Sequence, residues 1–194
     1  VEESLDRLGL DRVDGLYVHD ADDHLDQAVA EAVPALVELR RQGVVSHVGA
    51  GMNSVGPMKR IVTETDADQV MLAGRYTLLD RSAESDLLPT CAARSVAVVA
   101  AGVYNSGLLA DPRPGATFDY RDAPPDLVER ARSMQRLCAD FGVPLRAAAS
   151  QFPLRNGAVK QVAVGSRSPS QVIDNLEMFV HDVPDELWRA LAEV

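Results

Sequence analysis

The sequence has few cysteines and no long apolar run, and each shortage excludes a class of protein. Its two cysteines, Cys91 and Cys138, lie far apart and lack the spacing of metal ligands. We interpret them as free thiols in a reducing compartment, so we expect a cytoplasmic protein. No apolar run approaches the roughly 20 residues of a membrane-spanning helix, and no signal peptide is visible.

Positive charge is also scarce. Nineteen Lys and Arg residues face 29 Asp and Glu residues, which gives a formal net charge of −10. This balance argues against nucleic acid and against an anionic membrane surface as partners. No low-complexity tract or linker interrupts the 194 residues, so we expect a single domain over residues 1–194.

The chain lacks an initiating Met. Val1, Leu5 and Leu8 share one face at helical spacing, and Gly9 fits the end of a helix. We therefore expect that the sequence opens inside a helix whose preceding strand is absent, and that it represents part of a domain.

Short β-rich runs alternate with helical patterns along the chain. Strands are predicted at 13–18, 44–49, 68–73, 96–100 and 159–164. Helices are predicted at 25–41, 54–64, 82–93, 126–141, 144–151, 168–178 and 184–191. Consecutive parallel strands need such crossovers, so an open α/β sheet and a (β/α)₈ barrel both fit. Because a barrel needs eight strands and about 250 residues, five strands predict a truncated barrel or a smaller open fold.

Two features interrupt this pattern. Pro34 must either kink the helix predicted at 25–41 or start its main segment. The stretch 102–125 is rich in Pro and Gly, and we predict that it is irregular, the most mobile region and a cover for the substrate.

His19 and Asp20 directly follow the first predicted strand, where parallel α/β folds gather their ligands and chemistry. A histidine there can change protonation or donate a hydrogen bond near neutral pH. The alternative is a satisfied core or capping residue. The segment 19–24 would also offer two histidines and three carboxylates to a metal, but its spacing does not place them on one face. We favour a solvated loop that caps the next helix, and we predict no metal site.

Two glycine-containing segments are candidate anion sites. Residues 49–54 superficially match a phosphate loop but lack the third glycine, so a tight turn with an Asn or Ser cap is the alternative. Residues 165–169 follow a strand and combine an N-cap serine, a proline at the first helical position and Arg167. Backbone N–H groups, the helix dipole and the arginine suit a phosphate, although an ordinary capped helix with an exposed arginine also fits.

Several segments resemble the aldo-keto reductase superfamily in their order along the chain. Residues 4–19 and 165–176 resemble the family at large. The branch of D-threo-aldose 1-dehydrogenase (L-fucose dehydrogenase) is resembled by residues 39–45, 49–53, 72–79 and 104–109. The resemblance implies a (β/α)₈ TIM barrel, of which this chain would hold about five C-terminal βα units. By the same resemblance, His19 is the active-site histidine that hydrogen-bonds the reacting oxygen.

The resemblance also implies an activity, namely NAD- or NADP-dependent oxidation of a small sugar or aldehyde, with an aldose oxidised at C1 to the lactone. The cofactor-binding residues that it implies are Asn53, Tyr104, Asn105, Ser106, Gly165, Ser166, Arg167, Gln171 and Asn175. The substrate residues are Asp20, Arg75 and Tyr76.

The sequence departs from the family pattern at several positions. Gly51 and Met52 stand where many relatives have Ser-Asn, Ala73 replaces a glutamine and Ala101 a stacking tyrosine. Gln171 stands where many NADP-preferring relatives carry a second basic residue, which weakens the case for strict NADP preference.

The family's catalytic Asp, Tyr and Lys lie on earlier strands that this sequence does not contain. A non-catalytic or degenerate nucleotide-binding homologue is therefore the alternative function, whereas a metal hydrolase is disfavoured by the number of ligands. We expect the chain alone to be inactive, and to self-associate through unpaired barrel edges or to be marginally stable.

Overall fold

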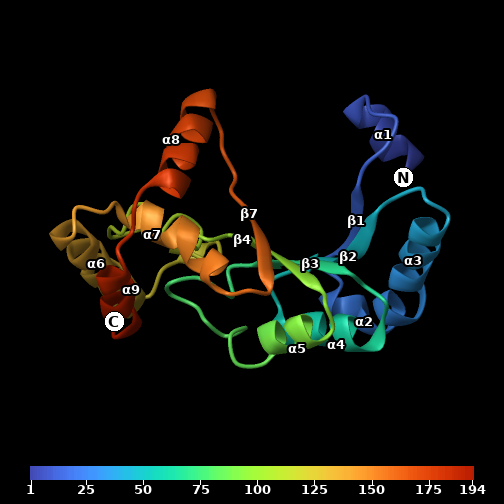
Figure 1. Ribbon diagram of the computed structural model, residues 1–194, viewed down its shortest axis with the longest axis horizontal. Coiled ribbons are helices and arrows are strands. Elements are labelled where there is room, and N and C mark those ends of the chain that lie inside the picture. Colours follow the sequence, from blue (N-terminus) through green and yellow to red (C-terminus); the bar gives the residue numbers. More distant parts are fainter. The chain divides into compact units, whose positions relative to one another are not determined.

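The computed structural model describes all 194 residues, and helices alternate with strands along most of the chain (Figure 1). Five strands form one sheet in the order β1-β2-β3-β4-β7, and the β1–β2 and β2–β3 pairs are parallel. The strands are β1 (Gly15–His19), β2 (His47–Met52), β3 (Gln69–Ala73), β4 (Ala97–Ala101) and β7 (Val159–Ala163). All five predicted strands are present.

The helices connect and flank these strands. They are α1 (Glu2–Leu8), α2 (Leu25–Gln27), α3 (Val33–Arg41), α4 (Val55–Glu64), α5 (Leu87–Ala93), α6 (Pro125–Asp140), α7 (Leu145–Gln151), α8 (Pro169–Val180) and α9 (Asp185–Ala192). None of them combines the length and the apolar character needed to cross a membrane.

The chain divides into two compact units. The first contains Val1–Leu72 and Ala83–Val99, and the second contains Ala73–Ser82 and Ala100–Val194.

In the first unit, helices α3 and α4 pack against β2. Met58 and Ile61 of α4 and Leu87 of α5 are completely buried, which fits the contact between these two helices. Gly49 permits the parallel pairing of β2 and β3, because a Cβ atom there would lie 1.6 Å from the carbonyl oxygen of Gln69. After His47 every residue of β2 is buried, whereas no residue of β1 is fully buried.

β2 begins three residues later than predicted. The N–H of Val44 donates to the carbonyl oxygen of Leu39, so this valine still belongs to the turn that ends α3. Pairing starts only where the N–H groups of Ser46 and His47 reach the carbonyl oxygen of Asp14. The two adjacent valines favoured a strand, but the backbone hydrogen bonds place them before it.

Pro34 starts the main segment of its helix. A π-helical turn at Ala28–Ala32 widens the backbone immediately before α3, and Pro34 is the second residue of α3. Proline has no N–H to donate, and its ring would clash with the carbonyl four residues earlier in a regular helix. A wider turn at this point accommodates both defects.

Two predicted elements differ in the structure. The helix predicted over 82–93 is shorter, because Asp80 accepts hydrogen bonds from the N–H and the hydroxyl of Ser82 and α5 starts only at Leu87. The stretch 102–125 is not wholly irregular, since β5 (Thr117–Phe118) and β6 (Arg121–Asp122) form an antiparallel hairpin. Its mobility and its cover of the substrate stay predictions.

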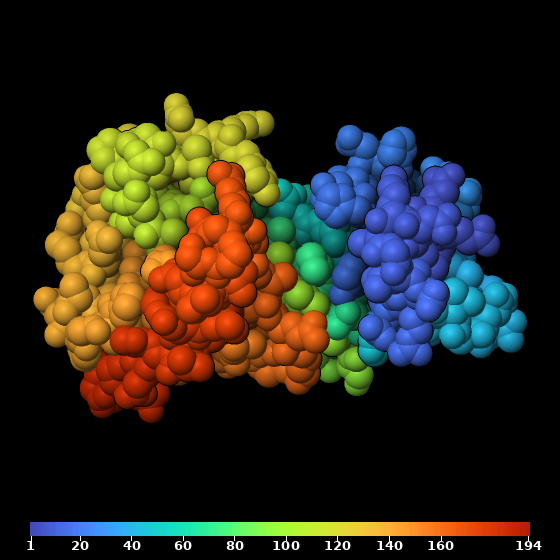
Figure 2. Space-filling model, turned by 90° about the horizontal axis from the view of Figure 1, so that it is seen from above, coloured from blue at the N-terminus to red at the C-terminus, as the bar shows by residue number.

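In the second unit, α6 packs against α7 and α9, and α7 packs against α8. Met134, Leu187 and Leu191 are completely or almost completely buried between these helices. α8 lies at the surface, where the orange-red chain is visible in Figure 2, and it exposes Ile173 and Leu176.

Both cysteines, one in each unit, are free and buried, which confirms the prediction of free thiols. Burial raises the pKa of each thiol to about 11, so neither is a reactive thiolate near neutral pH.

Candidate functional site

His19 is the last residue of β1 and lies opposite Gly51 of β2. The N–H of Asp20 donates to the carbonyl oxygen of Gly51 at 2.9 Å, and Asp20 then leaves the strand with φ of 45°. The His19 side chain is 80% exposed, and its Nδ1 lies 3.5 Å from a carboxylate oxygen of Asp20. The interpretation of His19 as a core residue is therefore wrong, and its imidazole is open to a ligand.

The absence of a side chain at Gly51 keeps one flank of that imidazole accessible. A Cβ atom at this position would lie 3.8 Å from His19 Cδ2 and 3.7 Å from the Cβ of Met71. Residues 49–52 lie within β2, so 49–54 is neither a phosphate loop nor a tight turn. Asn53, which follows β2 directly, is exposed.

A cavity of about 450 Å³ opens beside His19 and Asp20, with His24 and Glu31 also in its wall and alanines between them. This volume lies within the range of about 300–1,000 Å³ that is usual for small-molecule sites. The structure groups no three His, Cys, Asp or Glu side chains where they could hold a metal ion. His19, Asp20 and His24 bring hydrogen-bonding side chains to the wall of this cavity.

In the second unit, a chain of hydrogen bonds joins the segments that follow β4 and β7. The hydroxyl of Tyr104 donates to Oδ1 of Asn175 at 3.2 Å, and Nδ2 of Asn175 donates to Oγ of Ser166 at 3.0 Å. Burial raises the pKa of the Tyr104 phenol, so it remains a hydrogen-bond donor near neutral pH. Tyr104 and the start of α8 are thus held together by their own side chains.

The N-terminus of α8 is capped by the sequence around it. Oγ of Ser168 accepts from the N–H of Gln171 at 3.3 Å, and Oε1 of Gln171 accepts from the N–H of Arg167 at 2.7 Å. This reciprocal arrangement is a variant of the capping box. Arg167 remains exposed in front of the positive end of the helix dipole, where an anion is favoured.

An ion pair that sequence analysis did not identify fixes α8 against α7. Nη2 of Arg146 donates to Oδ1 of Asp174 at 2.8 Å, and Nη1 donates to the other carboxylate oxygen. These hydrogen bonds hold the pKa of Asp174 below its usual range. The two residues are 28 positions apart on different helices, so no local pattern announces the pair.

Asn105 and Ser106 have structural contacts of their own. Asn105 is 2% exposed, and its Nδ2 donates to the carbonyl oxygen of Gly74 at 3.2 Å. The N–H of Tyr120 donates to Oγ of Ser106 at 3.1 Å, which ties the β5–β6 hairpin to this turn. Gly102 must be glycine, because it has φ of 61° and a Cβ there would lie 3.1 Å from the N atom of Gly74. Contact of Asn105 and Ser106 with a cofactor stays a prediction.

Arg75 and Tyr76 are also engaged within the second unit. Arg75 donates to both carboxylate oxygens of Asp119, at 3.1 and 2.6 Å, and this pairing raises the pKa of its guanidinium. Tyr76 is 5% exposed, and its ring centroid lies 5.1 Å from that of Phe152. Their contact with a substrate stays a prediction.

Comparison with known proteins identifies the family and two of its similar members. The model of the aldo/keto reductase family matches residues 1–194. The chain is 44% identical to a D-threo-aldose 1-dehydrogenase of a Pseudomonas species over 100% of its own length and 60% of the relative's. It is 42% identical to a pyridoxal 4-dehydrogenase of Microbacterium luteolum over 98% of its own length and 59% of the relative's. The chain thus spans about three fifths of the length of these relatives.

Solved structures show the same fold. An aldo-keto reductase of Bacillus halodurans in its apo form superposes with a TM-score of 0.77 at 25% identity, covering 99% of this chain and 65% of that one. A glycerol dehydrogenase of Gluconobacter oxydans gives 0.71 at 22% identity, covering 99% and 61%. The fold is α/β, and the parallel strands with their helices form part of a TIM barrel, as predicted. Because the family model matches residues 1–194, this chain belongs to the aldo/keto reductase family.

Proposed function

We propose that this chain supplies the nucleotide-binding segment and the active-site histidine of an NAD(P)-dependent oxidoreductase that oxidises an aldose at C1 to its lactone. The observation that carries the proposal is the start of α8, where a capped helix N-terminus and the exposed Arg167 lie beside the Tyr104–Asn175–Ser166 hydrogen bonds. The Pseudomonas relative, named for an aldose dehydrogenase, supports the aldose as substrate class.

The residues around α8 fit the phosphate end of a nicotinamide dinucleotide. Gly165 and Ser166 leave the backbone exposed, and Arg167 offers a fork of N–H donors to a phosphate. Gln171 uses its side-chain oxygen for the helix cap and brings no second positive charge. We therefore expect both NAD and NADP to bind, without strict preference for NADP.

His19 would act on the substrate oxygen. A bound nicotinamide supplies the acceptor for the hydride that leaves C1. The hemiacetal hydroxyl would give up its proton to a base on the earlier strands, which this sequence does not contain. As it does so, charge develops on that oxygen, and a neutral imidazole donating a hydrogen bond stabilises it. The carboxylate of Asp20 lies 3.5 Å from Nδ1 and adds negative charge at this end of β1, and its contact with the substrate stays a prediction.

A second candidate substrate is pyridoxal, because the Microbacterium relative named for it is 42% identical, close to the value for the aldose enzyme. A degenerate homologue that binds nucleotide without turnover is the alternative to both. The three candidates differ in what they turn over, so an assay of turnover distinguishes them.

The test measures formation of reduced nicotinamide with the chain alone and with the chain joined to the part of the Pseudomonas relative that it does not cover. We expect no turnover by the chain alone, and turnover of L-fucose or a D-threo-aldose by the joined protein. Turnover of pyridoxal but not of aldoses would replace the substrate class. Tight nucleotide binding with neither turnover would make the chain a degenerate homologue.

Self-association through the free edges of β1 and β7 belongs to the same proposal. Both strands end the sheet order, so each presents backbone groups without a neighbouring strand. Sedimentation of the chain alone should show dimers or larger species, and those species should decrease in the joined protein. A monomer under both conditions would contradict this part of the proposal. Cytoplasmic location stays a prediction.

A further inference from the structure

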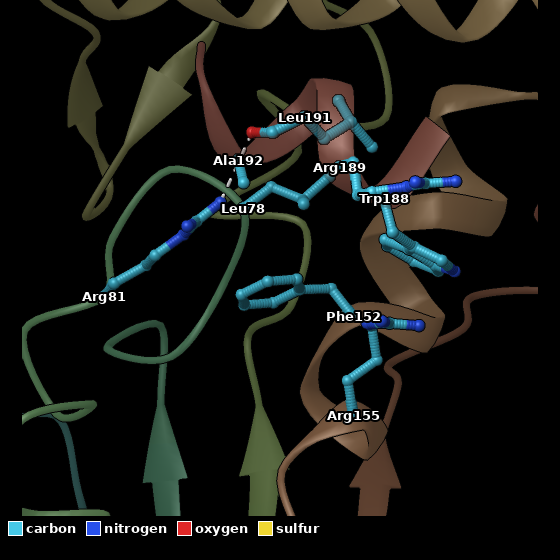
Figure 3. A pocket seen from close by; sticks show the side chains of 8 residues that line it. All are labelled: Leu78, Arg81, Phe152, Arg155, Trp188, Arg189, Leu191 and Ala192. Carbon is cyan, nitrogen blue, oxygen red and sulfur yellow. Dashed lines mark hydrogen bonds between the residues drawn. The ribbon is translucent and has the colours of Figure 1, made fainter. Parts of the chain in front are cut away.

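A second pocket lies in the second unit, and neither the nucleotide nor the substrate proposal uses it. It has a volume of about 240 Å³ and contains the side chains of Arg81, Arg155, Arg189, Phe152 and Trp188 (Figure 3). Phe152 and Arg155 precede β7, whereas Ser166 and Arg167 follow it. These two pocket residues and the start of α8 therefore lie on opposite sides of β7 in the chain.

The pocket concentrates positive charge in an acidic chain. Three arginines line it and no Asp or Glu does, although the chain as a whole carries a net charge of −10. Such a local excess of one sign attracts a ligand of the other sign.

Arg81 lacks the partners that an arginine inside a protein normally has. Its Nε is buried without any hydrogen bond, and Nη2 reaches only the carbonyl oxygen of Leu191 at 3.4 Å (Figure 3). The guanidinium carbon lies 4.9 Å from the ring centroid of Phe152, so the aromatic face holds it in place. Leaving a buried N–H without an acceptor is unfavourable, and an incoming anion would remove that cost.

Arg155 and Arg189 are only loosely neutralised. Arg155 stacks at 4.7 Å over Trp188, and its ion-pair partner Asp185 is 3.9 Å away with a side chain 84% exposed. Arg189 pairs with Glu186 one turn before it on α9, and both side chains are mostly exposed. Exposed pairs of this kind contribute little, so an anion in the pocket can compete for both arginines.

We propose that this pocket binds a phosphate group, either inorganic phosphate or the phosphate of a small monoester. Several guanidiniums around one cavity match a dianion with several oxygens better than they match a single carboxylate. Stacking on Phe152 and Trp188 occupies the faces of two guanidiniums and leaves their N–H edges for the oxygens.

The chain contains a single tryptophan, Trp188, so its fluorescence reports on this pocket alone. The 194-residue chain is titrated with sodium phosphate and, separately, with glycerol 3-phosphate, against sodium chloride at equal ionic strength. We expect a saturable change with phosphate and none with chloride. Tighter binding of the monoester would identify a phosphorylated small molecule as ligand, and equal binding would identify free phosphate.

Variants locate the site. Arg81→Gln should raise the Kd for phosphate at least about tenfold, and Arg81→Lys should do so less, because it keeps the charge but loses the planar fork. Arg189→Gln, at an exposed side chain, provides a second test if Arg81→Gln does not melt cooperatively. Arg113→Gln, at an exposed arginine outside both sites, is the matched control and should leave the Kd unchanged. A response without saturation, or one lost in Arg167→Gln and kept in Arg81→Gln, would overturn the proposal.

Discussion

The end of β1 and the start of α8 both carry residues that sequence analysis assigned to function, yet the chain supports them very differently. At the end of β1, the His19 side chain is 80% exposed and has one charged neighbour, Asp20, at 3.5 Å. At the start of α8, Ser166 and Asn175 bond to each other, Asn175 also accepts from Tyr104, and Gln171 and Ser168 close the cap.

The difference shows that this chain preorganises the proposed nucleotide-binding segment and not the proposed catalytic histidine. A binding site is most effective when neighbouring contacts fix its first residues in place. The α8 segment meets that condition through bonds between residues of its own unit. The imidazole of His19 does not, so its orientation depends on what binds beside it.

The largest expected effect is at His19. In the joined protein described above, His19→Gln should lower kcat/KM by about 10²- to 10⁴-fold, because the hydrogen bond to the developing charge is lost. The Kd for NAD or NADP should not change, since this histidine has no part in the α8 segment. Steady-state kinetics and nucleotide titration check both values.

The matched control for His19 is His24→Gln, which alters another histidine in the wall of the same cavity. It should leave kcat/KM within about threefold of the parent, because His24 donates no hydrogen bond to the developing charge in this proposal. Equal losses in the two variants would show that the cavity wall as a whole, and not His19, matters.

A smaller effect is expected at Arg167. Arg167→Ala should raise the Kd for nucleotide about tenfold, which corresponds to about 1.4 kcal/mol. Binding is measured by titration calorimetry on the 194-residue chain, with Arg113→Ala as the control for loss of an exposed arginine. Unchanged affinity for both NAD and NADP would refute the role of Arg167. It would also show that the fixed contacts at the start of α8 do not serve nucleotide binding.

The N-caps of α8 and α4 allow a test of how firmly the start of α8 is fixed, through the free energy of unfolding. Ser168 accepts a hydrogen bond at the start of α8, whereas Ser54 stands at the same position before α4 and accepts none. Ser168→Ala should lower the free energy of unfolding by about 1 kcal/mol, and Ser54→Ala by a few tenths at most. Urea denaturation of the two variants tests this, and losses of equal size would contradict it.

The smallest expected effect is a dependence on pH at Asp174. Arg146 lowers the pKa of this carboxyl from its ordinary value of 3.8, so the folded state binds its proton less readily than the unfolded state does. The ion pair therefore stabilises the fold above that pH, and the stabilisation is lost as the pH falls through the lowered pKa.

Asp174→Asn should accordingly melt slightly below the parent near neutral pH. The difference should shrink as the pH falls below 3.8 and vanish once the pH is below the lowered pKa of Asp174. Asp182→Asn, at an exposed carboxylate just after α8, is the control and should show no such dependence. A difference in melting temperature that persists in acid would mean that Asp174 acts through packing and not through its charge.

Much of the fold could be predicted from local patterns, because the spacing of apolar residues differs between strands and helices. The alternation of short apolar runs with helical periods gave all five strands, and Ser168 with Pro169 marked the start of α8. Errors occurred where hydrogen bonds overrode apolarity. Asp80 shortened the helix before Leu87, and Asp119 and Tyr120 in left-handed backbone made a hairpin within a Pro- and Gly-rich stretch.

The sequence by itself determined the family resemblance, the strand that ends in His19 and the capped start of α8, since these depend on residues close together in the chain. Tertiary structure alone decided the pairing of Arg146 with Asp174, the burial of Asn105 against Gly74 and the gathering of Arg81, Arg155 and Arg189 in one pocket. Those contacts join residues tens of positions apart, and which long side chains meet is set by helix packing and burial, neither of which leaves a periodic trace in the sequence.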